Sequence, residues 1–167
     1  MTEYKVEVFS DKTIWYSLDG QIHREDGPAV AYVNGSKSWY KNGKIHREDG
    51  PAVEYGDDEK YWYKNGKLHR EDGPAIEREG AYTAWLINGL FHREDGPAVE
   101  YGDGEKHWYI DGTLHREDGP ASEYPNGNKY WHINGKVLTE SEFNQRMNPC
   151  NGKIVEVEGK KYKLTQI

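Results

Sequence analysis

The sequence is poor in several residue types, and each shortage excludes a class of protein. Cys150 is the single cysteine among 167 residues, which excludes an intrachain disulfide framework and a cluster of thiolate metal ligands. Basic residues number 22 against 29 acidic ones, and the formal charge of −7 opposes binding to nucleic acid or to anionic lipid. No apolar run approaches the ~20 residues of a membrane span.

The N-terminus alternates polar and apolar residues from the start, so we expect no signal peptide and a cytoplasmic protein. Hydrophobic residues make up only 35% of the chain, yet aromatic residues reach 13%. Burial must therefore come mainly from amphipathic rings, which predicts a thin, aromatic core. The length suits one domain.

What the chain does have is an internal repeat. The heptapeptide His-Arg-Glu-Asp-Gly-Pro-Ala occurs five times without a substitution, always 23 residues apart. The copies begin at His23, His46, His69, His92 and His115. A second series keeps the same interval, namely Trp39, Trp62, Trp85, Trp108 and Trp131. Fixed spacing without insertions predicts stacked copies of one supersecondary unit.

Within each repeat, two alternating segments are separated by turn sequences, as in residues 51–55 and 60–64. A dipeptide that favours the type I′ turn of a hairpin follows the second segment. It recurs as Asn42-Gly43, Asn65-Gly66, Asn88-Gly89, Asp111-Gly112 and Asn134-Gly135. The sequence thus predicts an all-β repeat fold, an elongated and twisted antiparallel meander of stacked 23-residue hairpins.

Both ends of the array are expected to be capped. We divide the single domain, 1–167, into an N-terminal cap hairpin (1–22), the 23-residue repeats (23–136) and a C-terminal cap (137–167). Trp15 stands one residue before the tryptophan series, so the first unit is expected to be degenerate. A capping-box pattern at residues 139–142 predicts a short helix to about Met147, and residues 154–164 predict a final hairpin.

Strand alternation also predicts which side chains share a face. We expect Val53, Tyr55 and Trp62, with their equivalents such as Tyr101, on the packed face, and Glu54 with Tyr61 and Tyr63 on the opposite face. The second face varies between copies and is rich in tyrosine, a residue enriched at protein interfaces. The candidate protein-binding residues are Tyr40, Tyr61, Tyr63, His107, Tyr109, Tyr130 and His132.

The heptapeptide contains residue types used in catalysis and metal binding, but its spacing argues against both. Equivalent atoms of adjacent repeats lie about 9 to 10 Å apart if each repeat adds two strands, whereas zinc ligands approach the metal to about 2.0–2.1 Å. An enzyme needs one asymmetric, water-excluding pocket, and this motif is presented five times along an open array. We therefore expect no catalytic residues, no metal and no cofactor.

As a structural connector, the heptapeptide is expected to pair its arginine with a carboxylate of the adjacent copy. The alternative is a recurrent anion- or ligand-binding site. The arginines concerned in either case are Arg24, Arg47, Arg70, Arg93 and Arg116.

The 23-residue period with its Trp-Tyr-x-Asn-Gly core resembles the MORN (membrane occupation and recognition nexus) repeat superfamily. Residues 62–75, Trp-Tyr-Lys-Asn-Gly-Lys-Leu-His-Arg-Glu-Asp-Gly-Pro-Ala, look like the divergent repeat of many proteins of tailed bacteriophages and giant viruses. The resemblance covers roughly residues 16–138 and implies a twisted sheet of stacked hairpins with a non-catalytic scaffold or binding role. The glycine-rich Tyr-x-Gly-x-Trp register of ordinary MORN repeats is not reproduced.

Together these features predict a non-enzymatic protein-binding module. A phage origin, implied by the resemblance, would make it a protein that binds and inhibits a defence or metabolic protein in the host cytoplasm. Two alternatives stay open. One is a sponge for small molecules such as nucleotides, using connector arginines and ring stacking; the other is a virion or assembly scaffold that associates with itself through open sheet ends.

Overall fold

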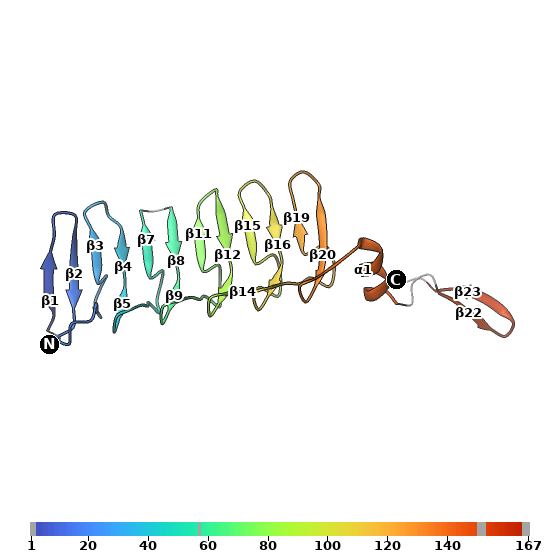
Figure 1. The fold of residues 1–167 in the computed structure, drawn as a ribbon, viewed down its shortest axis with the longest axis horizontal. Helices are drawn as coiled ribbons and strands as arrows, with labels where there is room; N and C mark the ends of the chain where they lie inside the picture. The colour runs from blue at the N-terminus through green and yellow to red at the C-terminus, as the bar shows by residue number, and fades with distance from the viewer. Residues whose placement is uncertain (1–2, 57, 150–152, 165–167) are drawn as a thin grey trace.

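The computed structural model describes residues 3–56, 58–149 and 153–164. Thirteen of its strands form one antiparallel sheet, and their order in the sheet is their order in the sequence. Short hairpins that are not part of this sheet lie between some of these strands along the chain. In spatial order these strands are β1 (Lys5–Val8), β2 (Lys12–Tyr16), β3 (Val30–Tyr32), β4 (Lys37–Ser38), β7 (Val53–Tyr55), β8 (Glu59–Tyr61), β11 (Ile76–Arg78), β12 (Tyr82–Ala84), β15 (Val99–Tyr101), β16 (Lys106–His107), β19 (Ser122–Glu123), β20 (Lys129–Ile133) and β21 (Lys136–Leu138). The hairpins stand side by side along one axis (Figure 1), which confirms the predicted elongated meander.

Each full repeat continues below the main sheet as a smaller hairpin. The four small hairpins are β5 (Tyr40–Lys41) with β6 (Lys44–Ile45), β9 (Tyr63–Lys64) with β10 (Lys67–Leu68), β13 (Leu86–Ile87) with β14 (Leu90–Phe91), and β17 (Tyr109–Ile110) with β18 (Thr113–Leu114). Their turns have the predicted positive φ angles, for example 53° at Asn65 and 82° at Gly66. Trp62 lies between β8 and β9, so the strand is interrupted at the tryptophan.

The most deeply buried residues are mostly small aliphatic side chains, and aromatic rings such as Trp62 and Tyr82 pack half-buried against them, so the prediction of an aromatic core is only partly correct. The five heptapeptide alanines, Ala29, Ala52, Ala75, Ala98 and Ala121, are fully buried. No large side chain in the described part of the chain is buried completely. A sheet that has no second layer cannot enclose a whole ring, so the tryptophans and most of the tyrosines are half-buried.

The N-terminal cap hairpin is formed by β1 and β2, as expected. Its tryptophan, however, makes the contacts of a complete unit. The amide of Trp15 donates to the carbonyl of Ala29 at 2.9 Å, just as Trp62 donates to Ala75 at 2.8 Å. The turn between Trp15 and His23 is one residue longer than the equivalent turn between Trp62 and His69, and this accounts for the offset of Trp15. The first unit is therefore not degenerate at its tryptophan.

The C-terminal cap also matches its prediction. The helix α1 (Glu140–Met147) begins with a capping box in which Thr139 and Glu142 exchange hydrogen bonds, and Phe143 packs against Ile133 and Leu138. The last hairpin is β22 (Ile154–Val157) with β23 (Lys160–Lys163). Within the described ranges, no helix is long and apolar enough to cross a membrane.

Candidate binding surface

Each heptapeptide forms a loop, here called a connector, that is organised around its arginine. In the third connector the guanidinium carbon of Arg70 lies 4.1 Å from the centre of the Trp62 ring. Its Nε donates to Asp72 at 3.0 Å, and its Nη1 donates to the carbonyl of Pro74 at 3.2 Å. The stacking recurs at 3.9 to 4.3 Å in all five connectors, as Arg24 on Trp15, Arg47 on Trp39, Arg70 on Trp62, Arg93 on Trp85 and Arg116 on Trp108.

The connector glycine lies against the same arginine. A Cβ at Gly73 would lie 2.7 Å from the guanidinium carbon of Arg70, so a larger residue there would displace the guanidinium from its present position. The expected pairing of this arginine with a carboxylate of the adjacent copy is corrected by the structure. The partner that all five arginines have in common is the aspartate two residues later in the same connector. Three arginines reach a further glutamate on the following strand, as Arg47 with Glu54, Arg70 with Glu77 and Arg116 with Glu123.

The connector histidine joins one repeat to the next. Nδ1 of His46 accepts a hydrogen bond from the amide of Asn65 at 3.1 Å, across 19 residues of sequence, while its Nε2 lies 3.4 Å from Glu48. A ring nitrogen that accepts from an amide carries no proton, so the proton of this imidazole is on Nε2. Among the described residues, no group of three or more His, Cys, Asp or Glu side chains is arranged to hold a metal ion.

Arginine lowers the pKa of four of the connector aspartates. Hydrogen bonding and charge attraction from Arg70 hold the pKa of Asp72 below its ordinary value. The same direction and cause apply at Asp26, Asp49 and Asp95. The five connectors are therefore ion-paired loops at the protein surface.

The strand register reverses the predicted faces. Val53 lies directly opposite Tyr61, and Glu54 lies opposite Lys60. Because residues that face each other across antiparallel strands point to the same side, Tyr61 shares a face with Val53, and the expectation that they lie on opposite faces is wrong.

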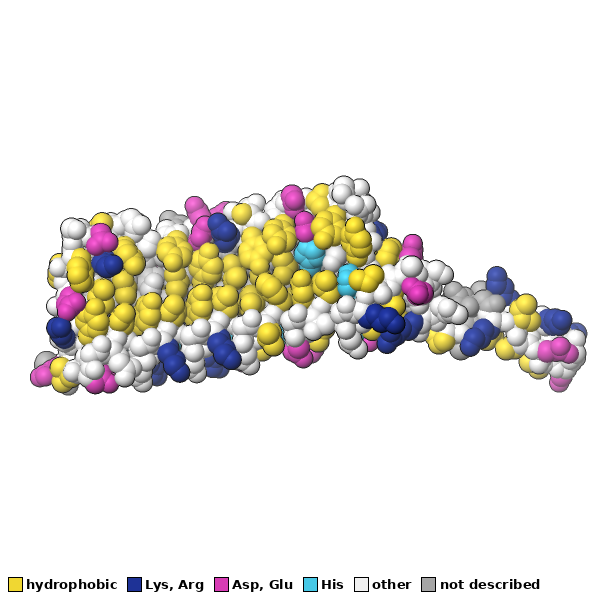
Figure 2. Space-filling model, in the orientation of Figure 1, with side chains coloured by type: hydrophobic (Ala, Val, Ile, Leu, Met, Phe, Trp, Pro, Cys, Tyr) yellow, Lys and Arg dark blue, Asp and Glu magenta, His cyan; other side chains and the backbone are white. Residues whose placement is uncertain are grey.

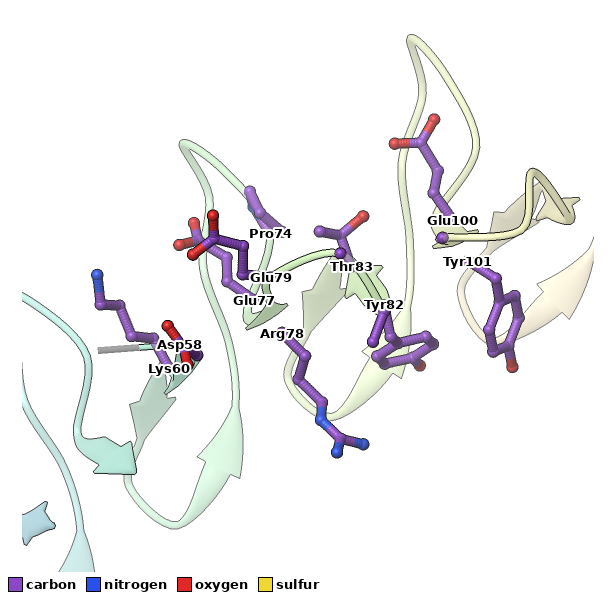
Figure 3. Close-up of a pocket in the computed structure, with 13 residues that line it drawn as sticks. Asp58, Lys60, Pro74, Glu77, Arg78, Glu79, Tyr82, Thr83, Glu100 and Tyr101 are labelled. Carbon is purple, nitrogen blue, oxygen red and sulfur yellow. The ribbon is translucent and has the colours of Figure 1, made fainter. Parts of the chain in front are cut away.

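The central strands show the two faces directly. In Figure 3, Arg78, Tyr82 and Tyr101 project to one side of the sheet, and Thr83 and Glu100 project to the other. We call the first side the aromatic face and the second the charged face. Figure 2 shows hydrophobic side chains in a continuous band along the array.

The aromatic face carries a row of rings held by their neighbours. Three edge-to-face pairs recur along it: Tyr55 with Tyr61 at 5.9 Å, Tyr101 with His107 at 6.2 Å, and Tyr124 with Tyr130 at 5.6 Å between ring centres. Between the first two pairs, Tyr82 packs 5.1 Å from Tyr101, and burial raises its pKa to about 12. The exposed fractions of Tyr55, Tyr101 and Tyr130 are 52%, 43% and 47%, so these rings are both fixed and accessible.

The predicted binding residues differ in accessibility. Tyr130 is exposed, and His132 is buried. The others, Tyr40, Tyr61, Tyr63, His107 and Tyr109, are half-buried. Sequence reasoning misses the exposed rings of Tyr55 and Tyr101, because it places Tyr55 and its equivalents on the packed face. Only the strand register shows that these rings belong to the aromatic face.

A series of hydrogen-bonded polar side chains interrupts the aromatic face. His107 contacts the hydroxyl of Ser122 through Nδ1 at 3.0 Å and the carboxylate of Glu105 through Nε2 at 2.6 Å. This order of groups resembles that of a nucleophilic triad, but Ser122 is only 3% exposed and its hydroxyl has no open approach. The cluster fixes the orientation of the His107 ring within the row.

The repeat that contains Arg78 has a local feature. Arg78 stands where the equivalent strands carry Tyr55 and Tyr101, and it donates to Glu59 at 2.9 Å. An open cavity of about 470 Å³ lies beside the turn around Gly80, lined by Glu77, Thr83 and other residues shown in Figure 3.

No protein-family model matches this chain, and no curated protein matches it significantly. The relation to MORN repeats therefore stays a prediction based on the repeated motif.

Proposed function

We propose that the chain is a non-enzymatic module that binds another protein through the aromatic face. The observation that carries the proposal is the row of exposed, perpendicularly braced rings at Tyr55, Tyr101 and Tyr130. Tyrosine and other aromatic residues dominate the energetics of protein interfaces. Rings that are already fixed lose little conformational entropy on binding, which favours affinity.

The connectors support a scaffold role more than the alternative of anion capture. An anion would need free guanidinium donors, yet Nε and Nη1 of Arg70 already donate to Asp72, to the carbonyl of Pro74 and to Glu77. The guanidinium face is also covered by Trp62. A nucleotide would have to displace these internal partners before it could bind.

The motif resemblance extends the proposal to a phage protein that binds a host protein and inhibits it. On this proposal the partner is a protein of the bacterial host. A bacterial lysate is accordingly the first place to look for it.

The test is an affinity capture with two matched double variants. In Tyr101→Ala/Tyr130→Ala, two exposed rings of the aromatic face are removed. In Glu100→Ala/Lys129→Ala, the neighbouring residues on the charged face are removed from the same strands. A partner retained by the wild type and the charged-face variant but lost by the aromatic-face variant supports the proposal.

Equal retention by both variants, with unchanged melting temperatures, contradicts binding through the aromatic face. A capture that finds no partner, combined with stabilisation of the wild type by nucleotides in a thermal-shift panel, would favour the small-molecule alternative.

A further inference from the structure

The C-terminal hairpin lacks a packing partner in the described part of the chain. All eight residues of β22 and β23 are exposed. Among them, Ile154 is 68% exposed, Val157 55% and Tyr162 50%. An isolated two-stranded hairpin is marginally stable in water, so this apolar surface needs another strand to complete it.

The main sheet has one end that can supply such a strand. At its C-terminal end, α1 packs against β20 and β21. At its N-terminal end, β1 is the outermost strand, and Val6 and Val8 are 46% and 78% exposed. An open apolar edge of this kind is a template for pairing with a further strand.

We propose that the C-terminal hairpin of one molecule pairs through β22 with the β1 edge of a second copy. The strands have equal lengths and similar sequences, Lys-Val-Glu-Val in β1 and Ile-Val-Glu-Val in β22. An antiparallel register with Val155 opposite Val6 places Glu156 opposite Lys5 and Ile154 opposite Glu7. The pairing thus joins valine to valine and a carboxylate to an ammonium group.

The charges of the two segments are complementary. Residues 153–164 contain four lysines and two glutamates, although the whole chain has a formal charge of −7. Residues 3–11 contain three acidic residues and one lysine. The lysines of β23 also protect the far edge of the hairpin, because charged residues on an edge strand oppose further pairing.

The pairing joins different molecules and is head-to-tail. The two segments lie at opposite ends of the array (Figure 1), so the hairpin does not reach its own β1. A head-to-tail contact leaves a free edge and a free hairpin at the two ends of every dimer, so it leads to linear oligomers. This association is independent of the proposed function and leaves the aromatic face uncovered.

The test is sedimentation velocity of the full chain over a wide range of concentrations, with two single variants. Val6→Lys disables the edge, and Val155→Lys disables the hairpin; both valines are exposed, so melting temperatures should stay at the wild-type value. Wild-type protein should form oligomers that grow with concentration, and each variant alone should stay monomeric. An equimolar mixture should form a dimer and nothing larger, because only one productive contact remains.

The matched control is Val33→Lys, at an exposed valine in the turn between β3 and β4, outside both strands of the proposed contact, which should assemble like the wild type. A wild type that is monomeric at every concentration would overturn the proposal. So would variants that assemble normally, or a mixture that fails to form the dimer.

Discussion

Substitution of the connector glycine Gly73 by alanine tests whether the guanidinium of Arg70 is what requires glycine there. Gly73 does not have a positive φ angle, and Gly→Ala at a compatible backbone position usually stabilises a protein by about 0.4–1 kcal/mol. Here the new Cβ would lie 2.7 Å from the Arg70 guanidinium carbon and would displace it. Losing the stack on Trp62 costs about 1 kcal/mol, and losing the hydrogen bond to the Pro74 carbonyl costs about another 1 kcal/mol.

The net expectation for Gly73→Ala is therefore destabilisation by about 1–1.5 kcal/mol. In the Arg70→Ala background the clash is absent, so the same substitution should be neutral or stabilising. Urea denaturation of the wild type, both single variants and the double variant measures this coupling. An equal cost of Gly73→Ala in both backgrounds would refute the role assigned to Arg70 and would place the requirement for glycine in the backbone itself.

Three further predictions concern stability. Arginine lowers the folded-state pKa of Asp26, Asp49, Asp72 and Asp95. These aspartates therefore stabilise the fold above their unfolded pKa of about 4, and this stabilisation is lost as the pH falls through the lower folded-state values. The melting temperature should fall on acidification below about pH 4, and it should fall less in Asp72→Asn. Ala75→Leu should destabilise by about 1–3 kcal/mol in urea denaturation, because the site is fully buried; a cost below the error of measurement would contradict its tight packing. Thr139→Ala should weaken α1 by about 1 kcal/mol, seen as faster amide exchange near Phe143, with unchanged exchange in β7 and β8 as the internal control.

The fold was predictable because its signals are local. Asn65-Gly66 specifies a tight hairpin turn through two positive φ angles, and the Thr139 and Glu142 pair specifies the start of α1. Repetition of these signals at a constant interval fixed the number and order of hairpins.

The assignment of faces failed because it depends on register. Val53 pairs with Tyr61, whereas a slip of one residue would pair it with Trp62 and exchange every side chain between the faces. Alternation within each strand is visible in the sequence, but the length of turn that aligns two strands is not. The interrupted strand at Trp62 adds to the ambiguity.

The role of the heptapeptide was hidden for a similar reason. Stacking of Arg70 on Trp62 and acceptance of the Asn65 amide by His46 join residues that a turn or a whole repeat separates. The identity of the five copies favours a structural connector. Which atoms each side chain contacts followed only from the arrangement in space.

Binding through the aromatic face is tested most directly by isothermal titration calorimetry with the purified partner. Loss of two exposed tyrosines that act as interface hot spots, at about 1–2 kcal/mol each, should weaken the Kd of Tyr101→Ala/Tyr130→Ala by about 30-fold or more. The charged-face variant Glu100→Ala/Lys129→Ala should keep a Kd close to that of the wild type. Equal affinities for the wild type and the aromatic-face variant, or a loss confined to the charged-face variant, would contradict the account.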